Sequence, residues 1–295
     1  MIRHYRVEDY HLAATLSSGQ AFRWRRLGDG WEGVIGGRWV LLRQAGNILE
    51  AMTAGPCSDW EWLERYLQLN VRLCDILRMF PKDILLQEAV RAWRGLRLLR
   101  QDPWECLASF LLSSNKQITQ IEQIVSELCG RWGDPVLVPP DHEPTWSFPA
   151  PERLACRTEG ELRACKMGFR APYLLEAARQ VREGKVDIGA LSSLDYEAAR
   201  QELLRLKGVG EKIADCVLLF SVGFLEAFPV DVWIRRELAR HFFSGRCPSD
   251  RELRRFIRDF FGPAGGYAQQ YLFHHARSGK KTGADSAPAQ PKQPN

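Results

Sequence analysis

The segment LKGVGEKIADC, residues 206–216, places a lysine close to two glycines. Glycine is needed where the backbone adopts a positive φ or where another group must approach it closely. We therefore expect a tight turn at Gly208 and Gly210 and a helix that begins near Glu211. The exposed amides of such a turn, together with the start of the next helix, form a site for a phosphate-sized anion.

The same segment follows the longer pattern L-x-G-h-G-x-x-x-A-x-x-h, in which h is an apolar residue. This pattern is the signature of the helix-hairpin-helix motif, which binds the DNA backbone without sequence preference. The structural alternative is a corner between two helices that binds no ligand, and two glycines alone would favour it. The complete pattern favours DNA.

Lys212 is placed in the first turn of the second helix, where the helix dipole disfavours a cation. Selection for stability alone would favour Asp or Glu at this position. An adjacent positive potential and partial burial would raise the fraction of nucleophilic amine. The alternative is a solvated or phosphate-contacting lysine, and the position of Lys212 by itself favours that alternative.

Asp231, in the segment FPVDVWIRREL, changes this balance. Aspartate is a preferred N-cap residue, so a purely structural role is also open. A capping carboxylate that faces a cleft can stabilise positive charge on a sugar carbon, as carboxylates do in glycoside hydrolysis. The hairpin, Lys212 and Asp231 form a specific combination, although each of them alone is a weak indication.

The elements that must position these residues follow from the apolar pattern. Residues 21–52 are typical of a β-meander, because short aromatic and β-branched runs alternate with glycine-containing turns. From residue 59 the apolar residues are spaced by three and four, as in amphipathic helices. The spacing predicts helices over 59–69, 86–99, 102–114 and 117–132, the last ended by Gly130, and near 152–165, 171–183, 195–206, 211–222, 231–242 and 249–260. The proline-rich stretch 133–151 is expected to be a surface loop without regular structure.

The expected fold class is α+β: an N-terminal antiparallel β-sheet domain followed by a large α-helical body that contains the helix-hairpin-helix motif. We place the sheet and its helices in residues 1–98 and the helical region in residues 99–277, with the N-terminal segment packing into it. The low apolar content of residues 278–295 predicts a disordered tail.

Composition narrows the class of protein further. The 295 residues carry 41 Lys and Arg against 36 Asp and Glu, and the net charge of +5 permits nucleic acid as a partner without requiring it. The 8 cysteines contain no CxxC pair, so neither a zinc site nor a redox dithiol is indicated. The N-terminus lacks a signal-peptide pattern, and no apolar run approaches the ~20 residues of a membrane helix. We expect a soluble intracellular protein with no membrane partner.

Six ordered motifs resemble those of the helix-hairpin-helix DNA glycosylases, and within them the eukaryotic-type 8-oxoguanine DNA glycosylase/AP lyases. The motifs extend over nearly the whole chain: SGQAFRW (18–24), GLRLLRQDPWECLASFLLSSN (95–115), MGFRAPYL (167–174), GVGEKIADC (208–216), PVDV (229–232) and GYAQQYLF (266–273). The resemblance implies a monomeric base excision repair enzyme that removes 8-oxoguanine from double-stranded DNA, opposite cytosine, through a lysine Schiff base. An AP lyase step would then nick the strand by β-elimination. The implied location is on DNA, in the nucleus or in the bacterial cytoplasm.

The resemblance also implies catalytic and base-binding residues. Lys212 would attack the anomeric carbon, and Asp231 would stabilise the oxocarbenium-like charge and orient the lysine. The backbone carbonyl of Gly19 would accept the hydrogen that 8-oxoguanine, unlike guanine, carries on N7. The remaining base-binding residues would sandwich the flipped base or read its Watson–Crick edge: Cys216 and Phe273 for the sandwich, Gln269 for the edge.

Other residues match positions that contact the rest of the DNA. Phe169 matches the aromatic wedge that fills the gap left by the flipped base, and Asn115 and Arg170 match residues at the orphaned cytosine. Contact with the DNA backbone is expected at the hairpin and beyond the catalytic aspartate, at Lys207, Gly208, Val209, Gly210 and Trp233.

Three positions depart from the family pattern. Gln120 stands where an arginine usually reads the opposite cytosine. The loss of the charged guanidinium donors predicts relaxed discrimination for cytosine. Trp233 replaces a usual histidine, and Lys207 replaces a common proline. These changes put the partner-base preference and the backbone contacts in question and leave the reaction unaffected.

No metal or cofactor is expected from the resemblance. Many relatives carry a four-cysteine iron–sulfur cluster beyond the catalytic aspartate, but Cys247 is the only cysteine after Asp231, which excludes that cluster. The family hairpin often holds a monovalent cation through backbone carbonyls, and the sequence allows one here.

Two other functions stay open on the sequence alone. One is a glycosylase of similar layout for alkylated or other damaged purines; Lys212 argues against it, because those monofunctional relatives lack the hairpin lysine. The other is a non-enzymatic protein that binds DNA structure, which would not need Lys212 and Asp231 together. Single residues also have structural alternatives: a core position for Cys216 and Phe273, a buried aromatic for Phe169 and a turn for Gly19.

Overall fold

The computed structural model describes residues 1–113 and 116–278. Its N-terminal part is a five-stranded antiparallel sheet in the order β1–β5–β4–β3–β2. The strands are β1 (Ile2–Arg6), β2 (Arg25–Leu27), β3 (Gly30–Ile35), β4 (Arg38–Ala45) and β5 (Ile48–Thr53). Strands β2 to β5 confirm the predicted meander. Strand β1 was not predicted; it is an edge strand that pairs with β5.

Six helices accompany the sheet and lead into the helical body. They are α1 (Leu12–Ser17), α2 (Glu61–Leu67), α3 (Leu73–Arg78), α4 (Ile84–Trp93), α5 (Pro103–Leu112) and α6 (Ile118–Trp132). The sequence pattern did not predict α1 and α3. The prediction of one helix over 86–99 was too long, because α4 ends at Trp93 and the Gly95 carbonyl instead accepts the His11 amide at 2.9 Å.

Gly130 does not end α6, as the pattern predicted; the helix continues to Trp132. A glycine inside a helix costs only about 1 kcal/mol relative to alanine, so it does not stop a helix that packs well. The stop lies at Gly133, whose amide donates to the Cys129 carbonyl at 2.7 Å. A Cβ at Gly133 would lie 2.1 Å from the Ser147 carbonyl oxygen, so the chain turns where the next segment packs against it.

The proline-rich stretch 133–151 contains a short hairpin, which corrects the expectation of no regular structure there. Strand β6 (Pro135–Val136) pairs with β7 (Thr145–Trp146). The pattern missed this hairpin because each strand has only two residues, and Val136 is buried with side chains of β3 and β4 rather than within its own segment.

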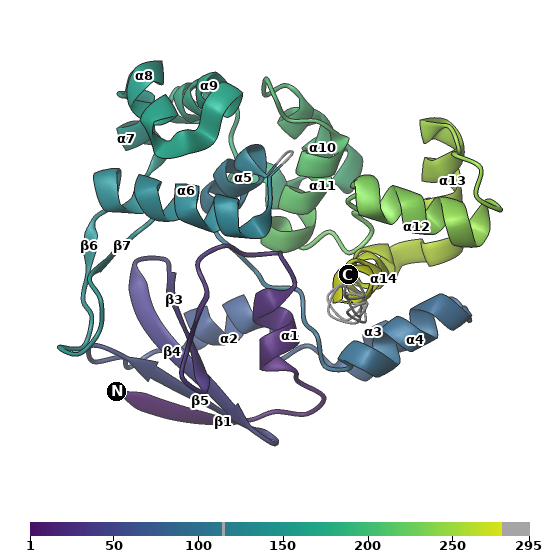
Figure 1. The fold of residues 1–295 in the computed structure, drawn as a ribbon, viewed down its shortest axis with the longest axis horizontal. Coiled ribbons are helices and arrows are strands. Elements are labelled where there is room, and N and C mark those ends of the chain that lie inside the picture. The colour runs from purple at the N-terminus through teal and green to yellow at the C-terminus, as the bar shows by residue number, and fades with distance from the viewer. Residues whose placement is uncertain (114–115, 279–295) are drawn as a thin grey trace, which may run out of the picture.

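Further helices complete the described part of the body (Figure 1). They are α7 (Pro151–Ala155), α8 (Glu159–Leu162), α9 (Ala171–Arg182), α10 (Tyr196–Leu204), α11 (Glu211–Val217), α12 (Val232–Phe242), α13 (Asp250–Phe261) and α14 (Gly265–Ser278). Two predicted helices are interrupted: 152–165 divides into α7 and α8, and 211–222 becomes α11 followed by a wider π-helical turn over 218–222. Helix α14 was not among the predicted helices.

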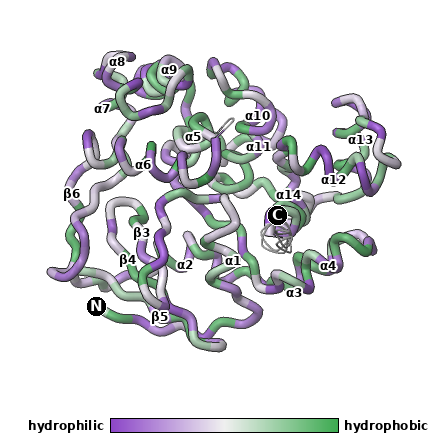
Figure 2. Tube along the Cα trace, in the orientation of Figure 1, coloured by the Kyte–Doolittle hydropathy of each residue, from purple (hydrophilic) through white to green (hydrophobic). Residues whose placement is uncertain are grey.

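The large core joins the two parts of the chain. Buried side chains before residue 99, among them Leu86 and Leu96, pack in the same cluster as those of α5, α11 and α14. Figure 2 shows hydrophobic colour around α11 in the interior and hydrophilic colour over much of α12 and α13. Helix α11 therefore lies where its residues are fixed from several sides. No helix among the described residues is both long and apolar enough to span a membrane.

Candidate active site and DNA interface

The predicted turn lies between α10 and α11. The Val209 amide donates to the Leu206 carbonyl at 3.0 Å, and Gly210 caps α11. Gly208 has a φ of +88°, and a Cβ there would lie 2.6 Å from the Tyr173 ring. Both the conformation and the close approach of Tyr173 therefore require glycine at 208. Lys207 and Gly210 are exposed, as a surface that contacts a phosphate backbone requires.

Lys212 is the second residue of α11 and is half-buried. Its Nζ donates a hydrogen bond to Ser113 Oγ at 3.1 Å and lies 4.9 Å from the centroid of the Phe110 ring. The Ser113 hydroxyl in turn donates to the Phe110 carbonyl at 2.7 Å. The amine therefore points toward the end of α5, where its acceptor among the described residues is a neutral oxygen. Sequence reasoning missed Ser113, since it lies 99 residues away from the lysine.

Asp231 is the N-cap of α12, and its Oδ1 accepts from the Ile234 amide at 2.8 Å. Asp231 and Lys212 line the same cavity, whose volume is about 690 Å³. Gly19, Phe273 and Trp233 also line it. The structure thus brings together five of the residues singled out in the sequence, from segments between residues 19 and 273.

Gly19 is held at the cavity wall by its neighbours. The Ser18 carbonyl accepts from Gln270 Nε2 at 3.0 Å, and the Gln20 carbonyl accepts from Gln101 Nε2 at 2.6 Å. The φ of Gly19 is +79°, and a Cβ there would lie 2.7 Å from Ile118 Cδ1. A side chain would therefore strain the backbone and collide with α6, while glycine leaves the backbone open to the cavity.

Cys216 and Gln269 are buried and are not on the wall of this cavity. Cys216 is 2% exposed, and burial raises the pKa of its thiol to about 12, although the Lys212 ammonium acts in the opposite direction. The thiol is therefore neutral at physiological pH. Gln269 donates from Nε2 to the Pro229 carbonyl at 3.0 Å, while its buried Oε1 has no hydrogen-bond partner among the described residues. Phe273, unlike these two, faces the cavity.

The residues expected at the opposite base lie apart from this cavity. Phe169 is 55% exposed, which argues against the buried alternative, and the Arg170 guanidinium lies 4.6 Å over its ring. Burial lowers the pKa of Arg170, whose guanidinium also lies 5.7 Å from the Tyr173 ring. Gln120 is exposed in the first turn of α6 and accepts the Gln117 amide at 3.0 Å. Asn115 lies outside the described residues.

Lys116 connects the cavity with a neighbouring groove that contains Gln120 and Lys166. Its Nζ donates to the Lys166 carbonyl at 3.3 Å. On the other side of the cavity Trp233 is 38% exposed, and the Arg236 guanidinium lies 5.7 Å from its ring. Exposed cations and aromatic rings thus flank the cavity, as single-stranded and flipped nucleotides require.

Comparison with known proteins identifies the family. Residues 4–107 match the family described as 8-oxoguanine DNA glycosylase, N-terminal domain, and residues 108–263 match the HhH-GPD superfamily base excision DNA repair protein. The chain belongs to the 8-oxoguanine DNA glycosylases of the HhH-GPD superfamily.

Individual relatives align with most of this glycosylase. A probable N-glycosylase/DNA lyase from Methanothermobacter thermautotrophicus is 37% identical, over 67% of this chain and 69% of its own. The N-glycosylase/DNA lyase OGG1 of Arabidopsis thaliana is 32% identical, over 92% of this chain and 78% of its own. The structure of the Clostridium acetobutylicum 8-oxoguanine glycosylase/lyase, in complex with dsDNA containing cytosine opposite 8-oxoG, is 29% identical with a TM-score of 0.87, covering 95% and 98% of the two chains.

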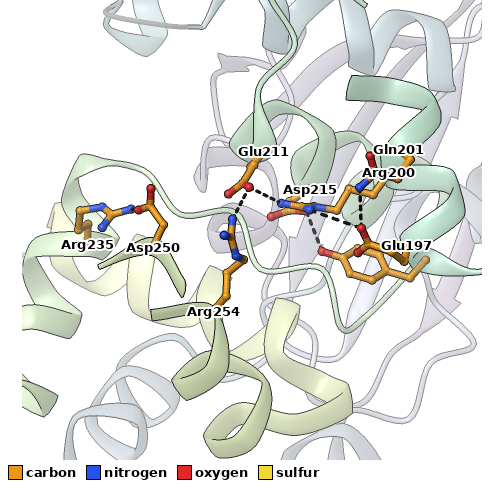
Figure 3. Close-up of polar contacts among 9 residues, drawn as sticks. Glu197, Arg200, Gln201, Glu211, Asp215, Arg235, Asp250 and Arg254 are labelled. Carbon is orange, nitrogen blue, oxygen red and sulfur yellow. Dashed lines mark hydrogen bonds and ion pairs between the residues drawn. The ribbon is translucent and has the colours of Figure 1, made fainter. Parts of the chain in front are cut away.

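Helix α11 also takes part in a network of charges that the sequence did not reveal. Asp215 Oδ1 accepts from the Tyr196 hydroxyl at 2.8 Å and from Arg200 Nε at 3.2 Å (Figure 3). Arg200 also lies 3.3 Å from Glu211, which is paired in turn with Arg254 of α13. These contacts join α10, α11 and α13 and so fix the helix that bears Lys212.

The charges of this network are unequally buried. Burial raises the pKa of Asp215 to about 6, against the hydrogen bonds from Tyr196 and Arg200, which lower it. Arg200 is 8% exposed; burial lowers the pKa of its guanidinium, but Asp215, Tyr196 and Glu211 more than offset this and raise it. At neutral pH the two buried groups therefore form an ion pair.

Among residues 1–113 and 116–278, no group of three His, Cys, Asp or Glu side chains is placed to hold a metal ion. The eight cysteines of the glycosylase are all free thiols.

Proposed function

We propose that this glycosylase removes 8-oxoguanine from duplex DNA through attack of the Lys212 amine on the anomeric carbon of the damaged nucleotide. A carbon–nitrogen bond forms as the glycosidic bond breaks, and the base leaves with the bonding electrons and takes up a proton. Opening of the sugar ring gives a Schiff base with the lysine. Loss of a C2′ proton then expels the 3′ phosphate by β-elimination, which nicks the strand.

The environment of Lys212 is the observation that carries this proposal. Its amine donates to the neutral Ser113 hydroxyl, and within the described part of the chain it forms no ion pair. A carboxylate within an ion-pair distance would hold the lysine as an ammonium ion, which is not a nucleophile. A neutral partner orients the amine without pairing it to a carboxylate.

Asp231 supplies the negative charge that the reaction needs. Its backbone position is fixed by the cap of α12, where one carboxylate oxygen already accepts the Ile234 amide. The charge of a fixed carboxylate stabilises an oxocarbenium-like transition state without reorganisation when the charge develops. Asp231 on the wall of the Lys212 cavity is therefore a side chain that performs two tasks: a structural cap and an electrostatic stabiliser.

Recognition of the lesion is proposed for Gly19, Phe273, Cys216 and Gln269. The Gly19 backbone would accept N7–H, and Phe273 would stack on the flipped base. Cys216 and Gln269 would reach the base only after a small opening of their surroundings, because both are buried. The unpartnered Oε1 of Gln269 supports its role, since a buried acceptor without a donor is rarely retained without a function.

Phe169, Arg170 and Gln120 are proposed to contact the opposite strand. The base opposite the lesion would be cytosine. The preference for cytosine would be weaker than an arginine at position 120 would give. Lys207, Gly208, Val209, Gly210 and Trp233 would contact phosphates, so binding to undamaged duplex should weaken steeply with salt. The monomeric state and a monovalent cation at the hairpin stay predictions.

The proposal is tested with the purified full-length protein on duplexes that contain 8-oxoguanine opposite cytosine, 8-oxoguanine opposite adenine, 3-methyladenine opposite thymine, or no lesion. We expect release of 8-oxoguanine and a nicked strand without added alkali, with a small difference between the two opposite bases. Release of 3-methyladenine but not 8-oxoguanine would overturn the substrate. Binding to every duplex without release of any base would overturn the enzymatic function.

A further inference from the structure

Arg277, in the last turn of α14, faces the cavity that holds Lys212 and Asp231. Its guanidinium carbon lies 5.3 Å from the centroid of the Phe273 ring, so the group packs against the ring. Its Nη1 atom would lie 2.9 Å from a Cβ built on Gly19. The guanidinium therefore lies directly against the backbone segment to which lesion recognition is assigned. No motif in the sequence pointed to this residue.

One nitrogen of the guanidinium has no acceptor in the described part of the chain. Nη1 is buried and has no hydrogen-bond acceptor among the described residues, and no ion pair of Arg277 is present in that part of the chain. Burial lowers the pKa of Arg277, while the more distant charges of Asp231 and Glu122 raise it. A buried charged donor without an acceptor is costly, so this side chain gains from any ligand that brings an acceptor into the cavity.

Two acceptors of a flipped nucleotide could reach the guanidinium: a carbonyl oxygen of the base or a phosphate oxygen. The position against Gly19 favours the base. On its five-membered ring 8-oxoguanine carries an N–H at N7 next to a carbonyl at C8, whereas guanine carries a lone pair next to a C–H. When the backbone acceptor faces N7 and the charged donor faces C8, they complement the first pair of groups and neither group of the second.

We propose that Arg277 is a specificity-determining residue that donates a hydrogen bond from Nη1 to the C8 carbonyl of the flipped 8-oxopurine. This inference rests on the proposed function, because it assumes that the damaged base enters this cavity. It adds a second contact that guanine cannot make to the one assigned to the Gly19 carbonyl. Phe273 packs against the guanidinium and also stacks on the base.

The test measures DNA binding in a Lys212→Gln background, which prevents turnover, with and without Arg277→Leu. The probes are duplexes with 8-oxoguanine opposite cytosine, a tetrahydrofuran abasic site opposite cytosine, and undamaged guanine opposite cytosine. The abasic duplex keeps every phosphate and lacks the base. Arg3→Leu serves as the matched control, since it removes one arginine from the edge strand of the sheet.

Arg277→Leu should weaken binding of the 8-oxoguanine duplex about tenfold or more, the usual size of a charged hydrogen bond, and change the abasic duplex by less than about twofold. Arg277→Lys should restore part of the loss. Equal weakening on both duplexes would assign Arg277 to a phosphate and overturn the proposal, and unchanged binding to both would also overturn it. If the parent protein does not distinguish 8-oxoguanine from guanine, the proposed function itself fails. A melting curve of each variant establishes that it is folded.

Discussion

The charged side chains of α11 lie in two different environments. Lys212 meets the Ser113 hydroxyl and the face of the Phe110 ring. Asp215 and Glu211 are instead matched by Arg200, and Glu211 also by Arg254 (Figure 3). The helix has only seven residues, so both environments lie within two turns.

This difference separates the residue that reacts from the residues that stabilise the helix. Charges that are matched by opposite charges hold helices together and gain little from the arrival of a ligand. A lysine opposite a neutral oxygen contributes little to stability but keeps its amine available for reaction. The ion-pair network fixes the helix, and that rigidity holds Lys212 in the cavity that Asp231 also lines. Variants around Lys212 should therefore change the chemical step, and variants in the ion-pair network should change stability.

The largest effect is expected for Asp231→Asn. Asparagine is as good an N-cap as aspartate, so the cap of α12 is kept while the negative charge is lost. The single-turnover rate of 8-oxoguanine release should fall by about a hundredfold to a thousandfold, the usual loss when a preorganised electrostatic group is removed. The melting temperature should change little. A variant that is equally active would remove Asp231 from the reaction.

The next largest effect is expected for Arg200→Met, and it depends on pH. Loss of one partner of a buried ion pair should lower the free energy of unfolding by about 3 kcal/mol at pH 7.5. Burial raises the pKa of Asp215 to about 6, above the ~3.9 of an unfolded aspartate. The stability that the protonated carboxyl contributes is thus fully present below about pH 4 and is lost as pH rises through about 6.

At pH 5 the Asp215 carboxyl of the folded protein binds a proton and needs its arginine less. The destabilisation by Arg200→Met should then fall to roughly half of its value at pH 7.5, as measured by chemical denaturation at both pH values. Below the melting temperature the variant should keep its rate of base release per folded molecule. A large loss of rate without a loss of stability would contradict the division between the reactive lysine and the supporting ion-pair network.

The smallest effect is expected for Ser113→Ala. The variant removes the acceptor of the Lys212 hydrogen bond, which should slow base release about threefold to tenfold, the value of one neutral hydrogen bond. Affinity for the lesion duplex should stay the same, because Ser113 is assigned to orienting the amine and not to binding DNA. Ser113→Thr keeps the hydroxyl and should restore the rate. An unchanged rate in Ser113→Ala would show that the hydrogen bond does not orient the nucleophile.

Local sequence patterns predicted much of the fold. They missed the elements that form through contacts with residues distant in the sequence. The meander over 21–52 alternates within itself, so its strands could be recognised. Strand β1 is mostly exposed and exists because it pairs with β5, 46 residues along the chain. The prediction that α6 ends at Gly130 is wrong, because α6 is kept helical beyond this glycine by packing against other segments.

The candidate site divides in the same way. Lys212 and Asp231 carry local signals, a cation at a helix start and an N-cap after a proline, so their positions could be predicted. Ser113 and Asp215 carry none, because each matters through a side chain on another element. Arg277 carries none, because it matters through its position against Gly19, near the start of the chain. The structure buries Cys216 and Gln269 behind the cavity wall, which no motif could indicate.

The central claim is that Lys212 is the nucleophile, and borohydride trapping tests it most directly. The full-length protein is incubated with a duplex that contains 8-oxoguanine opposite cytosine, and borohydride reduces any Schiff base to a stable amine. We expect a covalent protein–DNA complex with the parent protein and with Lys185→Gln, an exposed lysine after α9, and none with Lys212→Gln. Equal trapping by Lys212→Gln would contradict the account, because another amine would then have to form the Schiff base.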